Sequence, residues 1–106
     1  MAYSRLEILL KLKAENPDDS FNSYALALEY MKDDIAQSLD IFKQLLISNP
    51  DFLPTYYQLG KIYQDTEAYD EALEIFKKGC EVAKSQNNTK TLNELNSAIL
   101  EIEYDI

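Results

Sequence analysis

The chain has 106 residues, 46% of them hydrophobic and 27% charged, with a formal net charge of −9. These values are typical of one soluble globular domain, and no stretch approaches the ~18 apolar residues that cross a bilayer. The negative charge disfavours nucleic acid as a partner, because phosphate backbones are repelled. With neither a membrane span nor an apolar N-terminal signal segment in the sequence, a cytoplasmic location is expected.

Catalytic and metal chemistry have few candidate residues in this chain. Histidine is absent and Cys80 is the only cysteine, so Ser-His and Cys-His dyads and thiolate metal clusters are excluded. The acidic pairs Asp18-Asp19 and Asp33-Asp34 lie at expected helix junctions, where Asp caps a helix or satisfies a turn. We therefore expect no enzyme activity, no cofactor and no metal.

The first expected helix runs from about Tyr3 to Glu15, with Ser4 as its N-cap and Asn16-Pro17 as its end. The same Asn-Pro-Asp sequence recurs at residues 49–51, and the two prolines are 50 − 17 = 33 residues apart. This separation is close to the ~34-residue period of a common helical repeat.

Residues 18–50 are expected to form a pair of helices. The first helix, capped by Asp19 or Ser20, runs to about Met31, and the second ends at Pro50. Their apolar and small residues follow helical spacing and are Ser23, Leu26, Ala27 and Tyr30 in the first helix, then Ser38 and Phe42 in the second.

Residues 51–85 carry a clearer version of the same pattern. Helices are expected over Leu53–Thr66 and Tyr69–Ser85. The first contains Tyr56-x2-Leu59-Gly60-x2-Tyr63, and the second contains Ala72-x3-Phe76 followed by Gly79. The spacing i, i+3, i+4, i+7 forms one stripe on a helix, and the small residues mark where two helix backbones approach closely.

This order of residues resembles the tetratricopeptide repeat, with Tyr56 where tryptophan is commonest. The resemblance covers residues 18–85 well and implies an all-α solenoid that acts as a non-catalytic protein-interaction module. The first helix then resembles the second helix of a repeat that lacks its first. Because Ala27 occupies the position equivalent to Gly60, we expect Gly60→Ala to be almost neutral.

A last helix is expected over about Thr89–Tyr104, with Thr91 and Glu94 as a capping box. Its buried stripe is formed by Leu92, Leu95, Ile99 and Ile102, as expected of a helix that covers the end of a repeat array. The predicted organisation is one domain, 1–106, with an N-terminal helix (1–17), a degenerate repeat (18–50), a second repeat (51–85) and a capping helix (88–105).

The resemblance also implies a site, because the first helix of each repeat presents one stripe to a concave inner surface. The candidate partner groove consists of Phe21, Tyr24, Leu28, Met31, Tyr57, Lys61 and Gln64. Most other aromatic rings fall on expected core positions, namely Tyr30, Phe42, Tyr56, Tyr63, Tyr69 and Phe76. A protein or peptide is the expected partner.

Two alternatives concern the groove. Phe21, Tyr24 and Leu28 could instead be covered by the first helix or by a second copy of the chain, in a scaffold homodimer formed through the inner or the C-terminal helix surface. The carboxylate clamp of some members of the family, which needs Lys and Asn on successive helices, is not expected. Tyr24, Leu28 and Gln58 occupy its positions here.

Overall fold

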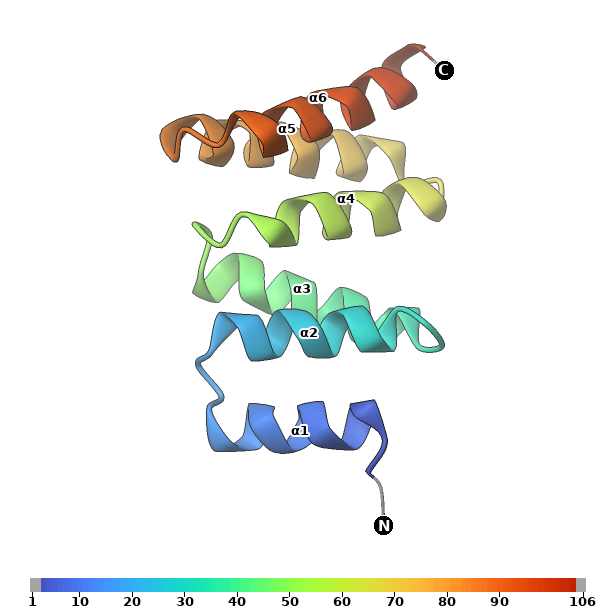
Figure 1. The fold of residues 1–106 in the computed structure, drawn as a ribbon. Coiled ribbons are helices and arrows are strands. Elements are labelled where there is room, and N and C mark those ends of the chain that lie inside the picture. The colour runs from blue at the N-terminus through green and yellow to red at the C-terminus, as the bar shows by residue number, and fades with distance from the viewer. Residues whose placement is uncertain (1–2, 105–106) are drawn as a thin grey trace. The chain divides into compact units, whose positions relative to one another are not determined.

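The computed structural model describes residues 3–104, which form six α-helices and no strand (Figure 1). The predicted all-α class is therefore confirmed. The chain divides into two compact units, of which the first ends at Phe52 and the second begins at Leu53. The grouping of both units into one domain stays a prediction.

The first unit contains three helices, α1 (Arg5–Glu15), α2 (Ser20–Tyr30) and α3 (Ile35–Ser48). The predicted N-cap of α1 is confirmed: Ser4 Oγ accepts from the backbone N–H of Glu7 at 3.1 Å, and Glu7 Oε1 accepts from the backbone N–H of Ser4 at 3.4 Å. The helix ends one residue before Asn16, because the residue before a proline is disfavoured in the helical conformation.

The other two helices of this unit are capped by aspartates. Asp19 Oδ1 accepts from the backbone N–H of Phe21 at 2.9 Å, so Asp19 rather than Ser20 is the cap of α2. Asp34 Oδ1 accepts from the backbone N–H of Gln37 at the start of α3. These contacts support the structural interpretation of the acidic pairs.

The second unit contains α4 (Pro54–Asp65), α5 (Tyr69–Ser85) and α6 (Thr89–Tyr104). Helix α5 packs on both α4 and α6. Glu67 and Asn87, in the two turns, adopt positive φ angles of 64° and 57°, which end the preceding helices sharply. One predicted core ring is misplaced: Tyr69 is 47% exposed, because it is the first residue of α5.

The crossing of α4 and α5 is formed by the predicted motif. Tyr56, Leu59 and Phe76 are buried there. A Cβ added at Gly60 would lie 2.7 Å from Cζ of the Phe76 ring and nearer still to two other ring carbons. The expected close approach is confirmed, but the expectation that Gly60→Ala is neutral is wrong, because a fully buried ring already occupies the space of the methyl group.

Helix α6 covers α5 with Leu95, which is fully buried and lies 3.0 Å from the position of a Cβ added at Gly79. The predicted capping box at Thr91 is wrong, because Thr91 lies inside the helix. Asn88 is the cap, and its Oδ1 accepts from the backbone N–H of Thr91 at 3.0 Å. Leu95, Ala98 and Ile99 form the buried face.

Candidate functional site

The aromatic part of the candidate groove lies on one side of α2. The ring of Phe21 is 71% exposed and meets Phe52 edge-on, with centroids 5.1 Å apart and planes at 89°. Tyr24 is half-buried and contacts both Phe52, at 5.7 Å, and Phe42, at 5.9 Å. Phe42 is fully buried on α3. Tyr24 therefore joins the core of this unit to an exposed aromatic surface.

Leu28 and Met31 continue this surface along α2. They follow Tyr24 by four and seven residues and so lie on the same side of the helix. Both side chains are half-buried. The structure thus brings the four predicted residues of the first unit onto one side of α2.

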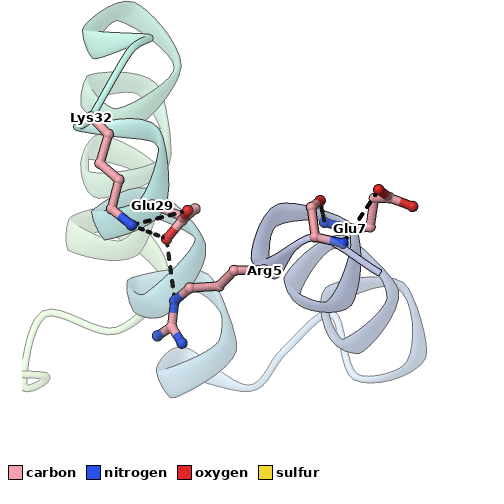
Figure 2. A network of polar contacts seen from close by, with 5 residues as sticks. Arg5, Glu7, Glu29 and Lys32 are labelled. Atoms are coloured by element: carbon pink, nitrogen blue, oxygen red, sulfur yellow. Dashed lines mark hydrogen bonds and ion pairs between the residues drawn. The ribbon is translucent and has the colours of Figure 1, made fainter. Parts of the chain in front are cut away.

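Helix α1 contacts a different side of α2. Arg5 Nε lies 3.2 Å from Glu29 Oε2, and Lys32 Nζ lies 3.0 Å from the same oxygen, as Figure 2 shows. Lys13 Nζ donates to Ser23 Oγ at 2.8 Å. Ser23 is one of the buried residues of α2, whereas Phe21 is 71% exposed. The first helix therefore does not cover Phe21.

The polar part of the candidate groove lies in the second unit, on α4. Lys61 Nζ donates to Gln64 Oε1 at 3.2 Å, and Gln64 Nε2 donates to Glu101 Oε2 of α6 at 3.3 Å. Lys61 Nζ also lies 4.0 Å from Glu101 Oε2. Tyr57 is half-buried one turn before Lys61, with its ring 6.3 Å from that of Phe76.

In the polar row formed by Lys61, Gln64 and Glu101, Lys61 is paired rather than free. The side chain of Lys61 is 30% exposed, and its ammonium group is paired with the carboxylate of Glu101, whose side chain is 49% exposed. An exposed pair of this kind is weak and is rearranged easily when another charged group approaches. The row therefore offers a cation, an amide and a carboxylate together, and favours a ligand of mixed charge.

Two residues of this surface were missed by sequence reasoning. Phe52 follows α3 in the linking segment, and its contact with α2 depends on packing between residues 31 positions apart, since Phe21 and Phe52 belong to different helical segments. Glu101 adjoins the buried stripe of α6, so its place beside α4 follows from the packing of that stripe. The predicted buried stripe of α6 therefore indicated where Glu101 would lie.

The seven predicted residues fall into two groups, four on α2 and three on α4. A single groove formed by both groups stays a prediction. Between residues 3 and 104, no three His, Cys, Asp or Glu side chains gather so that they could hold a metal ion. No helix in the same part of the chain is long and apolar enough to cross a membrane.

Cys80 is the single cysteine of the chain. It is a buried free thiol on α5, and its Sγ lies 3.4 Å from Asn96 Oδ1 of α6. Burial raises the pKa of the thiol, and the nearby Lys84 opposes that shift in part. A raised pKa keeps the thiol neutral, which is typical of a structural rather than a reactive cysteine.

Comparisons with known proteins agree with the repeat pattern. Residues 53–86 match a family model described as a tetratricopeptide repeat. The crystal structure of a tetratricopeptide repeat domain protein from Salinibacter ruber is similar, with 40% identity and a TM-score of 0.77 over 80% of this chain and 96% of that chain. A solution NMR structure of a tetratricopeptide repeat domain protein from the same organism is also similar. It has 39% identity and a TM-score of 0.80, over 83% of this chain and 90% of that chain.

The crystal structure of MamA shares the fold, with 18% identity and a TM-score of 0.63 over 94% of this chain and 67% of that chain. No curated protein matches the sequence. The repeat motif, the helical pairs and the similarity to the Salinibacter ruber domain along nearly its whole length lead to one assignment. The chain belongs to the tetratricopeptide repeat family.

Proposed function

We propose that this chain is a non-catalytic module that binds a protein or peptide partner through the exposed sides of α2 and α4. Tetratricopeptide repeat proteins generally act in protein–protein interaction, and the family is generally non-catalytic. The absence of histidine and the burial of Cys80 agree with a binding role, because neither a common general base nor an accessible thiol is offered.

The observation that carries the proposal is the exposure of Phe21. A large ring that is 71% exposed to water gains free energy when a partner covers it. The edge-on contact with Phe52 restricts the ring in the free protein, so less conformational entropy is lost on binding. Aromatic residues that are exposed and already restricted in the free protein are typical anchors of protein interfaces.

The polar row on α4 supports a specific rather than a purely apolar ligand. Lys61 can turn from Glu101 toward an acidic group of the partner, and Glu101 can then accept from a basic or amide group. The net charge of −9 opposes uniformly acidic peptides. The partner segment is therefore expected to carry an apolar side chain together with charges of both signs.

The test begins with peptides selected from a displayed library against the wild-type chain. Phe21→Ala and Tyr57→Ala should each weaken binding about 5- to 150-fold, the effect of losing about 1–3 kcal/mol at an aromatic anchor. Ile47→Ala is the matched control, because Ile47 is 83% exposed and belongs to α3 rather than to α2 or α4.

The outcomes separate three cases. Loss of affinity in both variants, with Ile47→Ala unchanged, supports one site that uses both helices. Loss with Phe21→Ala alone limits the site to the first unit. Equal affinity for all four proteins, measured by calorimetry, would contradict the proposal.

A further inference from the structure

A recess of about 420 Å³ lies in the first unit, where the end of α1 and the start of α2 meet the last turns of α3. Its uncharged and basic polar side chains come from all three helices and are Lys13, Ser20, Ser23, Gln44, Ser48 and Asn49. Its apolar wall is formed by Pro17, Ile41 and Leu45. A recess of this volume is large enough for a small ligand and offers it both kinds of contact.

Lys13 brings a positive charge to this recess that no ion pair neutralises within residues 3–104. The side chain is half-buried, and its Nζ donates to Ser23 Oγ at 2.8 Å and to the backbone carbonyl of Pro17. Both acceptors are neutral. Because partial burial removes part of the hydration of the ammonium group, an anion beside it would be stabilising.

The other basic residues do not share this combination of burial and missing partner. Within the same range, five of them form ion pairs with carboxylates, namely Arg5, Lys32, Lys61, Lys77 and Lys78. The remaining lysines are exposed to water, namely Lys11, Lys43, Lys84 and Lys90. In a chain with 19 acidic and 10 basic residues, a half-buried lysine left without a carboxylate indicates a place for an external one.

Neutral donors with unused capacity line the same recess. An ammonium group has three N–H donors, of which Lys13 uses two within the described chain. Asn49 Nδ2 donates to Ser20 Oγ at 2.9 Å, which leaves the second N–H of the Asn49 amide and the O–H of Ser20 for another acceptor. A carboxylate accepts several hydrogen bonds through two oxygens and matches one cation with neutral donors around it.

We infer that this recess binds a carboxylate carried on a short apolar chain, with the carboxylate at Lys13 and the chain against Ile41 and Leu45. Asp18 also lines the recess, and the net charge of the protein is −9, so a dianion such as phosphate is disfavoured. A free branched acid and a glutamate side chain of a peptide both offer this chemistry.

The inference goes beyond the proposed partner binding, because the recess lies on other side chains. None of the candidate groove residues lines it. Neither do the clamp positions Tyr24, Leu28 and Gln58. Binding here can therefore fail while the proposed function holds, and the reverse.

Amide NMR titrations near neutral pH test the site with 4-methylpentanoate and with a blocked peptide that carries one glutamate between two leucines. At least one of these should give saturable shift changes at residues 13, 20, 48 and 49, with a dissociation constant of about 1–10 mM. The signals of Tyr57 and Lys61 should not move. Two neutral controls, 4-methylpentanamide and the peptide with glutamine in place of glutamate, should leave all these signals unchanged. Inorganic phosphate at equal ionic strength should bind at least about tenfold more weakly.

Two variants with matched controls make the result specific. Gln44 is exposed, and its Nε2 donates to Asp40 Oδ2 at 3.2 Å. Gln44→Glu replaces that contact by repulsion and supplies the recess with its own carboxylate, so it should raise the dissociation constant at least about tenfold. Gln37→Glu makes the same change of charge on an exposed residue of α3 outside the recess and should bind like wild type.

Lys13→Met keeps most of the apolar stem and removes the charge, so saturable binding should be lost. Lys11→Met, the same change on an exposed residue of α1 outside this recess, should bind like wild type. If Lys13→Met does not fold, as judged by circular dichroism, Gln44→Glu and Gln37→Glu decide the matter.

The outcomes separate the sources of the carboxylate. Binding of the free acid alone, or of both probes with similar affinity, supports a small acid as the ligand. Binding of the peptide alone, or at least about tenfold more tightly, supports an acidic side chain of a protein. Absence of saturable binding by either probe, equal binding of a neutral control or of phosphate, or wild-type affinity in Gln44→Glu would each overturn the inference.

Discussion

The substitution Gly60→Ala tests the helix crossing at the centre of the second unit. The added methyl group would lie 2.5 Å from Cδ1 and 2.7 Å from Cζ of Phe76, well inside van der Waals contact. Phe76 is fully buried, so its ring has no open space to enter. Overpacking of this kind destabilises by about 1–3 kcal/mol.

A second effect opposes this destabilisation. Alanine is better than glycine inside a helix by about 1 kcal/mol. The expected net loss is therefore about 1 kcal/mol for Gly60→Ala, whereas Gly60→Leu adds three further carbons and should lose more than about 3 kcal/mol.

Urea unfolding followed by circular dichroism measures these differences. The matched control repeats Gly60→Ala in a Phe76→Leu background, where the ring is gone. There the same methyl group should be neutral or should stabilise by up to about 1 kcal/mol, its helix propensity alone. Stabilisation by Gly60→Ala in the wild-type background would refute the reasoning, since it would mean that the ring moves aside freely.

Three other measurements address single residues of the second unit. The hydroxyl of Thr55 is buried and has no hydrogen-bond partner within the described chain, so Thr55→Val should raise the free energy of unfolding by about 1 kcal/mol, and a loss would show that the hydroxyl is satisfied. Asn88→Ala removes the cap of α6 and should cost about 0.5–2 kcal/mol in urea unfolding, whereas no change would assign the cap to another group. Burial raises the pKa of the Cys80 thiol, so the stability that this shift contributes is present at neutral pH and is lost as pH rises through the raised pKa. The free energy of unfolding of wild type, relative to that of Cys80→Ala, should therefore fall above about pH 9. A difference that does not change with pH would contradict the raised pKa.

Local signals in the sequence predicted the helices well. Prolines after Asn16 and Asn49 mark the ends of α1 and α3, and the structure places both asparagines at the C-caps. The bounds Tyr69–Ser85 and Thr89–Tyr104 were predicted as the structure has them. These features depend on neighbouring residues, which is why sequence patterns predict them.

Features that depend on packing between distant residues were not predicted. The motif indicated that Gly60 lies at a crossing, but only the position of the Phe76 ring shows that even a methyl group does not fit. Ala27 was a misleading guide to the effect of Gly60→Ala, because this matching position of the first unit belongs to a different pair of helices. Likewise Phe52 joins the candidate site through a contact that no local pattern encodes.

The central claim is that the exposed sides of α2 and α4 bind a partner, and an amide NMR titration with a selected peptide tests it most directly. The account predicts that the largest shift changes occur at Phe21, Tyr24, Phe52, Tyr57 and Lys61, with α1 and the outer residues of α3 unchanged. Shift changes confined to α1 and α3, with the Phe21 and Tyr57 signals unmoved at saturation, would contradict the account.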